Sequence, residues 1–351
     1  MPAARPEAPQ GAAISPRYNG VLALIASYRA LREHAALGAV APRAVIAVGG
    51  ADRASFLHGL LTNDVEALAP GSGCYAAWLT PQGRMITDVH VLATDDRILL
   101  DVPAQQAPDL LQRLDQFLFS EDVQLADLSS ALVAVWIHGP FAAPAVERIL
   151  RVSGLGSWAA YRHVTAPFGD GLARIVRIDQ LGVPGYGIYI DAPRASELHA
   201  AFEADGVPDA TPDAVEAARV EAGYPVFGVD MTTDTIPLEA GIEDRAVSFT
   251  KGCYVGQEVI VRVLHRGHGR VARRLMGLRV EVMVPPGARI LADGGDIGAV
   301  TSAAQSPRVG PVAMGYVRRD FAASGTRVAV ETPGGTVAAV VSDRPIAPDD
   351  R

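Results

Sequence analysis

The first part of the chain shows helical and strand-like hydrophobic patterns in turn. Apolar residues recur at helical spacing over residues 21–37, so this segment predicts a helix. A short apolar run at 44–50 ends in two glycines and predicts a strand. The segment ADRASFLHGLL then predicts a second helix with Asp52 as its N-cap. The buried face of that helix is expected to hold Phe56, Leu57, Leu60 and Leu61.

A meander follows, because three apolar runs are joined by tight connections. The runs are YAAWLT, RMITDVHVLA and RILLDVP, and the connections are PQG and TDD. They predict three antiparallel strands. An amphipathic helix at 109–119 closes this block.

The middle of the chain again mixes strands and helices. ALVAVWIHGP, ARIVRID and YGIYID predict strands, and AVERIL and PRASELHAAFEAD predict helices. Thr211 followed by Pro212 marks the start of a further helix, and Gly223 marks its end. Residues 224–247 keep no sustained period, so that segment is either a functional loop or a disordered one.

From about Arg274 onward the chain consists of short β-rich runs separated by glycines. The runs are LMGLRVEV, ARILA, GAVTSA, VAMGYV, TRVAVE and TVAAVVSD. Their even spacing favours a small barrel or sandwich.

Composition narrows the classes of function. The net charge of -8 argues against a general electrostatic grip on nucleic acid, although residues 262–274 form a local basic stretch. Cys74 and Cys253 are too few for a disulfide framework and fit a reducing compartment. The sequence holds no apolar run of about 18 residues that would predict a membrane span. The first residues lack the apolar core of a secretory signal, so we expect a cytoplasmic protein.

Cys253 stands in the polar, glycine-punctuated segment SFTKGCYVGQEVI, two residues after Lys251. A nearby cation favours the reactive thiolate, and Gly252 and Gly256 permit close backbone approach. The alternative is a buried structural thiol, which is the common state of a free cysteine. Cys74, at the start of a predicted strand, is expected to be structural.

A Cys-rich zinc or cluster site built by this chain alone is not expected, because no second cysteine lies at metal-ligand spacing from Cys253. His265 and His268 could ligate a metal with Cys253, or they could belong to a basic surface. Such a surface could meet an anionic ligand tail, an RNA or a protein partner. It would also hold Arg262, Arg266, Arg270, Arg273 and Arg274.

Two acidic residues are candidates for ligand binding. Asp88 lies in the middle of an apolar strand, where a carboxylate is costly unless it is paired or acts on a ligand. Glu221 lies at the end of a predicted helix and could accept two hydrogen bonds from an amidine-like edge, such as that of a pterin or a guanine. The alternative for each is an ordinary surface or helix-end acid.

The segment TKGCYVGQE resembles the K-G-C-Y-x-G-Q-E motif of the folate-binding YgfZ family. That family is related to the glycine-cleavage T-protein, an aminomethyltransferase. Similar blocks run in order from about residue 20 to 345. They are YRALREHAALGAV, GGADRASFLHGLLTNDV, WLTPQGRMITDVHVL, RIDQLGVPGYGIYI and RVEAGYPVFGVDMTTDTIPLEAGI.

The resemblance implies an α+β, three-domain T-protein-like fold. Two interleaved α+β domains would surround a central folate-binding hole, and a β-barrel would end the chain. After a disordered lead-in at 1–17, the first domain would comprise 18–48 and 131–220. The second, which carries the Lys-Gly-Cys motif, would comprise 49–130 and 221–272. The barrel would span 273–345.

The resemblance also implies roles for single residues. Asp88 matches an acidic residue near the reactive folate nitrogens, with Thr87 in the neighbouring place. Glu221 matches a pterin-binding glutamate, and Arg219 matches the arginine before it. The catalytic candidates are therefore Cys253, Asp88 and Lys251. The cofactor-binding candidates, for tetrahydrofolate or a one-carbon-substituted form, are Glu221, Arg219, Asp88, Tyr254, Gly256, Gln257 and Glu258.

Three functions are consistent with these residues. The first is a tetrahydrofolate-binding factor that supports maturation or repair of iron–sulfur proteins, with Cys253 as a functional thiol and client or carrier proteins as partners. The second is a folate-dependent aminomethyltransferase or demethylase that uses Asp88. The third is an adaptor that binds RNA or protein through the basic stretch 262–274.

Overall fold

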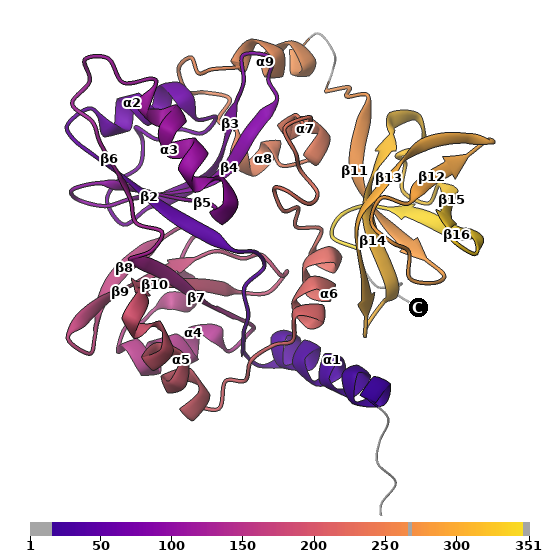
Figure 1. Cartoon of the computed structure of the whole chain (residues 1–351), viewed down its shortest axis with the longest axis horizontal. Helices are drawn as coiled ribbons and strands as arrows, with labels where there is room; N and C mark the ends of the chain where they lie inside the picture. Colours follow the sequence, from indigo (N-terminus) through magenta and orange to yellow (C-terminus); the bar gives the residue numbers. More distant parts are fainter. Residues whose placement is uncertain (1–15, 266–268, 347–351) are drawn as a thin grey trace, which may run out of the picture.

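The computed structural model describes residues 16–265 and 269–346. These residues form two five-stranded antiparallel sheets and a closed six-stranded barrel, with the barrel beside the two sheets (Figure 1). The predicted α+β, three-domain fold with a C-terminal barrel is confirmed. No helix in these residues is long and apolar enough to cross a membrane.

The first sheet has the strand order β1-β7-β10-β9-β8. Its strands are β1 (Ala36–Leu37), β7 (Leu132–His138), β8 (His163–Phe168), β9 (Gly171–Arg177) and β10 (Gly185–Asp191). Helices α4 (Ala142–Leu150) and α5 (Ala195–Ala204) contribute to its core, through Val146 and Phe202 among others. Strand β8 was not predicted; it lies at the edge of the sheet, where Pro167 is tolerated and the hydrophobic alternation is weak.

The second sheet has the order β3-β4-β5-β2-β6 and confirms the predicted meander. Its strands are β2 (Arg43–Gly49), β3 (Gly73–Leu79), β4 (Met85–Ala93), β5 (Ile98–Pro103) and β6 (Gln124–Asp127). Helices α2 (Arg53–Leu60) and α3 (Ala107–Asp115) contribute to its core. Asp52 lies at the N-cap of α2 as predicted, but its carboxylate accepts from the Asp122 N–H instead of capping the helix.

The two sheets meet through a shared apolar cluster. Val45, Ala47, Leu92 and Leu99 of the second sheet contact Trp136, Val176, Ile178 and Tyr189 of the first or of its flanking turn. Strand β2 belongs to the second sheet, so the sheets divide before residue 43 and not at the expected residue 48. The chain therefore leaves the first sheet after β1, forms the whole second sheet and returns at β7.

Two helices lie between the sheets and the barrel (Figure 1). Helix α1 (Pro16–Glu33) ends four residues earlier than predicted, because Ala36 and Leu37 pair with β7. Helix α6 (Pro212–Ala222) has the predicted ends: the Thr211 hydroxyl accepts from the Ala214 N–H, and Gly223 adopts φ +65°.

Residues 224–247 form a structured segment with two short helices, α7 (Pro237–Ala240) and α8 (Glu243–Ala246). Four-residue helices are too short to give a readable period, yet Phe227, Met231, Leu238 and Ile242 are buried. Helix α9 (Gln257–His265) follows the cysteine segment. Further single turns of 3₁₀ helix occur at Ala104–Gln106, Leu155–Ser157, Ala192–Arg194 and Arg319–Phe321.

The barrel closes in the order β11-β14-β13-β12-β15-β16. Its strands are β11 (Arg273–Val280), β12 (Arg289–Ala292), β13 (Gly295–Ser306), β14 (Gly310–Arg318), β15 (Arg327–Thr332) and β16 (Gly335–Ser342). Its interior is filled by small and branched side chains such as Val300, Ala313 and Val330. The barrel is thus a packed core and not a ligand channel.

Candidate functional site

Asp88 belongs to a buried polar network between the two sheets. The Arg43 guanidinium joins it to a second carboxylate: Nη1 lies 3.2 Å from Asp88 Oδ1, and Nε lies 2.7 Å from Asp101 Oδ1. Both aspartates are buried, and a buried carboxylate needs such partners. Burial alone would raise the pKa of Asp101, but Arg43, His90 and Tyr189 outweigh it and lower this pKa to about 2.

Aromatic and imidazole groups complete this network. The Tyr75 hydroxyl donates to Asp88 Oδ2 at 3.0 Å, and the Tyr189 hydroxyl donates to Asp101 Oδ2 at 2.5 Å. His90 lies between Asp101 and Tyr224, at 3.0 and 3.3 Å. Burial lowers the pKa of His90. A neutral imidazole beside a carboxylate donates from Nδ1, so Nε2 is left to accept from the Tyr224 hydroxyl.

Arg43 also lines two hollows. One, of about 170 Å³, is walled by Trp136 and Tyr189. The other, of about 310 Å³, is walled by Gln106 and Phe227. Of the network, Arg43 lines both hollows, Asp101 and Tyr189 line the smaller one, and Asp88 lines neither.

Most of this network was not predicted. Asp101 carries the signal that identified Asp88, a carboxylate inside an apolar strand, and His90 shares a strand face with Asp88 two residues away. Those patterns could have found both. Arg43 and Tyr224 carry no such local signal, because the fold alone brings them to the two aspartates.

Lys251 fixes the cysteine segment to helix α2. Its Nζ donates to the carbonyl oxygens of His58, Leu61 and Asn63 at 2.5, 2.7 and 3.1 Å, near the C-terminal end of that helix. Carbonyls at a helix end are the acceptors that a lysine ammonium satisfies best. Burial lowers the pKa of Lys251 to about 8.

Cys253 itself is exposed. The next residue, Tyr254, is buried, and its ring centroid lies 5.0 Å from the Lys251 Nζ. Gly256 adopts φ +85°, and a Cβ there would lie 2.5 Å from the Thr80 carbonyl oxygen, so only glycine fits. Gln257 and Glu258 begin helix α9. The segment is thus held on both sides of Cys253 and presents the thiol to solvent.

Cys74 differs from Cys253 in its surroundings. It is partly buried at the start of β3, and burial raises its pKa to about 12. A thiol with such a pKa is almost entirely protonated at neutral pH and is a poor nucleophile. This environment suits the structural role expected for Cys74.

Glu221 and Arg219 lie at the contact of α6 with α1 and the barrel. The fully buried Glu221 carboxylate accepts from Tyr28, Arg32, Ser306 and Arg308. The Arg219 guanidinium donates to Glu216, Asp230, Ser302 and the Tyr224 carbonyl. Neither shares a hydrogen-bond partner with Asp88, although Arg219 donates to the carbonyl of Tyr224, whose hydroxyl lies 3.3 Å from His90 Nε2. A folate contact by Glu221 would require displacing protein partners, and it stays a prediction.

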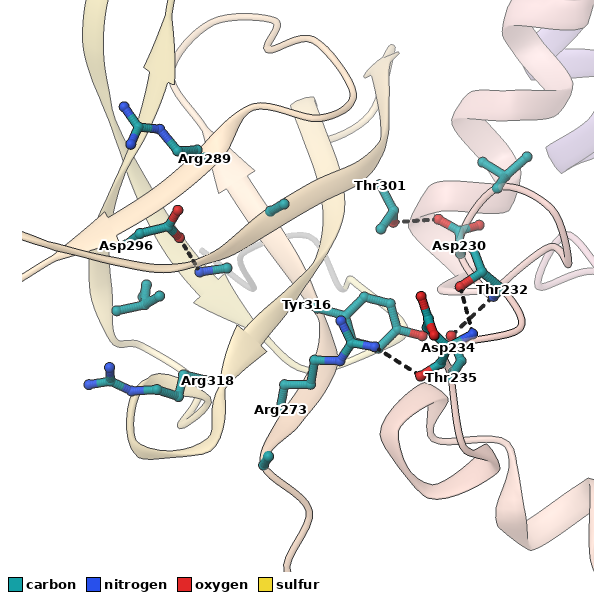
Figure 2. A pocket seen from close by; sticks show the side chains of 15 residues that line it. Asp230, Thr232, Asp234, Thr235, Arg273, Arg289, Asp296, Thr301, Tyr316 and Arg318 are labelled. Carbon is teal, nitrogen blue, oxygen red and sulfur yellow. Dashed lines mark hydrogen bonds between the residues drawn. The ribbon is translucent and has the colours of Figure 1, made fainter. Parts of the chain in front are cut away.

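A hollow of about 570 Å³ lies between the barrel and residues 229–235 (Figure 2). In it, Arg273 lies over the Tyr316 ring at 4.5 Å and donates to Glu239 and to the Asp234 carbonyl. Part of the predicted basic surface therefore makes contacts inside the protein. Arg266 and His268 lie outside the described residues. Within the described ranges, no group of three or more His, Cys, Asp or Glu side chains is arranged to hold a metal.

Comparison with known proteins agrees with this architecture. The family model of the GCVT N-terminal domain matches residues 16–251, and that of the glycine cleavage T-protein C-terminal barrel domain matches residues 273–347. The chain belongs to the glycine-cleavage T-protein family. It is 30% identical over 331 residues to an aminomethyltransferase of Nostoc sp. (strain PCC 7120). The aligned residues cover 91% of this chain and 86% of that protein.

Other members of the T-protein family are similar over the same length. An aminomethyltransferase of Streptomyces coelicolor is 29% identical over 306 residues, or 85% of this chain and 82% of that protein. The crystal structure of glycine cleavage system aminomethyltransferase T from Bartonella henselae superposes with a TM-score of 0.82 at 25% identity, covering 92% of this chain and 89% of that one. The T-protein-like fold therefore extends over both sheets and the barrel.

Proposed function

We propose that this chain binds tetrahydrofolate, or a one-carbon-substituted form, and supports maturation or repair of iron–sulfur proteins with Cys253 as its functional thiol. This is a YgfZ-type function within the T-protein family. The folate part rests on one observation above all: Arg43, which holds the buried Asp88 carboxylate, lines two hollows. Relatives named aminomethyltransferases support a one-carbon ligand.

The residues around Arg43 fit an elongated ligand that contains rings. Trp136, Tyr189 and Phe227 give apolar walls, while Gln106 and the network supply hydrogen-bonding groups. Small-molecule sites combine apolar walls with a few placed polar groups in this way. Tetrahydrofolate, when bound, supplies the nitrogen atoms that carry a one-carbon unit.

Asp88 is the group that would act on those nitrogens. Arg43 and Tyr75 hold its carboxylate in one orientation. A carboxylate fixed in this way can accept a proton from a ligand nitrogen, or stabilise positive charge that develops on it. Arg43 and Tyr75 then act as positioning residues for Asp88.

Anaerobic calorimetric titration with tetrahydrofolate tests the folate part. Wild-type protein should bind, and Asp88→Asn should bind at least about tenfold more weakly, because one charge-assisted hydrogen bond contributes about 1.5–3 kcal/mol. Asp96→Asn is the matched control, since Asp96 is an exposed aspartate in the turn between β4 and β5 that pairs with Arg97. Absence of binding to the wild type would remove folate from the proposal.

The thiol part is supported by the way the cysteine segment is held. Lys251 and Gly256 fix the backbone on either side of Cys253, while the thiol itself is exposed. An exposed sulfur on a fixed segment can reach a cluster, a persulfide or a one-carbon unit on a second protein. The described residues hold two cysteines, too few to hold a cluster without a partner.

A second candidate function is folate-dependent aminomethyl transfer or demethylation at Asp88. The observation that favours it is the network of Asp88, Arg43 and Asp101, which places fixed charge beside a ligand-sized space. In this case Cys253 would have no part in the chemistry. The two candidates therefore differ in which residue is essential.

Complementation of a strain that lacks the gene separates them, with the activity of an iron–sulfur enzyme in extracts as the readout. If the thiol function is right, Cys253→Ser should reduce this activity to the level of the deletion, while Cys74→Ala restores it. Full activity of Cys253→Ser together with loss in Asp88→Asn would instead favour the aminomethyl-transfer function.

A further inference from the structure

Arg245, the third residue of α8, lies between two tyrosine rings beside Asp88. Its guanidinium carbon is 4.9 Å from the Tyr75 ring centroid and 4.5 Å from that of Tyr224. The guanidinium forms no hydrogen bond or ion pair with any residue that the structure describes. Its donors are therefore left for solvent or for a ligand.

Two other arginines lie over tyrosine rings and differ from Arg245 in this respect. Arg32, over Tyr28 at 5.3 Å, donates to the Glu221 carboxylate. Arg273, over Tyr316 at 4.5 Å, donates to the Glu239 carboxylate. Arg32 and Arg273 thus each contact a tyrosine ring and also donate to a carboxylate of the protein. Arg245 contacts two tyrosine rings but donates to no carboxylate among the described residues.

The charges around Arg245 leave room for an added anion. Arg344 lies close to it, and burial together with the positive charge of Arg245 lowers the pKa of Arg344 to about 10. Asp88 acts on Arg245 through its charge but forms ion pairs and hydrogen bonds with Arg43 and Tyr75 instead. A guanidinium has five donors, so those of Arg245 can serve an acceptor that a ligand brings.

We propose that Arg245 binds a carboxylate of the ligand that occupies the Asp88 site. This inference rests on the proposed folate binding, since folate carries two carboxylates on its glutamate end. Tyr75 connects the two positions, because its hydroxyl donates to Asp88 while its ring supports Arg245. A guanidinium matches a carboxylate with two parallel hydrogen bonds, so this contact would select ligands with an acidic tail.

Titration of Arg245→Gln with three probes tests the contact: tetrahydrofolate, the tetrahydropterin ring alone, and p-aminobenzoylglutamate. The variant should lose about tenfold to a hundredfold in affinity for the two probes with carboxylates and nothing for the ring. Arg273→Gln, the matched arginine with a protein acceptor, should bind all three as the wild type does. Unchanged affinity of Arg245→Gln, or equal loss for the ring, would overturn the contact.

Stability of the ligand-free protein gives a second readout. Both arginines lose ring contacts when they are replaced, but Arg273 also loses hydrogen bonds to protein acceptors. Arg273→Gln should therefore lower the midpoint of thermal unfolding more than Arg245→Gln does. A larger drop for Arg245→Gln than for Arg273→Gln would overturn the inference. If the wild type binds no tetrahydrofolate, the proposed function fails, and this stability readout still tests Arg245.

Discussion

Lys251 shows how one side chain can set the position of another. Its ammonium is committed to three carbonyl oxygens near the end of α2, two residues before the exposed Cys253. Because the Lys251 ammonium donates to backbone carbonyls, its part in any thiol chemistry would be to fix the position of the segment that carries Cys253. The exposed cysteine then owes its placement to the fold of the second sheet.

Burial of Lys251 makes stability depend on pH in a specific window. Its pKa is about 8 when folded and 10.5 in the unfolded reference, so between these values the unfolded chain binds more protons. The free energy of unfolding of the wild type should therefore rise across this window relative to Lys251→Met. Urea unfolding of both proteins at pH 7.5, 9 and 10.5 measures the difference. A difference that stays constant or falls would contradict the lowered pKa.

At this scale, sequence patterns reveal a charged residue but not its partners. A carboxylate within an apolar strand identified Asp88, and the same pattern marks Asp101. For Glu221, the matching glutamate position predicted a pterin contact, whereas the structure surrounds the carboxylate with Tyr28, Arg32, Ser306 and Arg308. Which side chains meet a helix end depends on how α1 and the barrel pack, and no local spacing contains that information.

At the scale of elements, the Asp230 carboxylate links helix α6, strand β13 and the segment that begins at Val226. Its carboxylate accepts from Arg219 of α6 at 2.6 Å and from Thr301 and Ser302 of β13 at 2.6 and 2.7 Å. It also accepts from the Val226 N–H, which fixes the segment that walls the hollow of about 570 Å³ (Figure 2). One buried carboxylate thus joins the barrel to the rest of the molecule.

Asp230→Asn should destabilise the protein by about 3–5 kcal/mol, because it leaves Arg219 buried with an incomplete set of acceptors. Asp234→Asn is the control, since Asp234 lies in the same segment but is exposed, and such changes stay within about 0.5 kcal/mol. Chemical denaturation of both variants gives the comparison. Equal stability of the two variants would show that the Asp230 contacts contribute little.

The observed element boundaries agree with the predicted ones where capping or turn residues next to the boundary define it. Thr211, Pro212 and Gly223 define both ends of α6, and the tight turns define the meander. Helix α1 was extended too far, because Ala36 and Leu37 leave the helical pattern to pair with β7, a hundred residues away. The edge strand β8 was missed for a similar reason, since its pairing with β9 is what makes it a strand.

For the whole molecule, the T-protein-like architecture places the candidate site where no single unit contains it. Arg43, Asp88 and Asp101 come from the second sheet, Tyr189 from the first, and Tyr224 and Arg245 from the segment that leads to the cysteine. Side chains from different units therefore have to be aligned together. Changes at the sheet-to-sheet cluster, such as Trp136→Ala, would disturb this alignment by removing the ring that packs against Tyr189, without removing a hydrogen bond of the polar network.

The interleaving of the two sheets also affects how the chain is made. During synthesis β1 emerges early but finds its partner only when β7 has been added, whereas β2 to β6 are adjacent in sequence and complete their sheet by Asp127. Chains fold progressively as they leave the ribosome. The second sheet is thus the first to be finished, and the nascent protein carries an unpaired N-terminal arm until residue 138 has been translated.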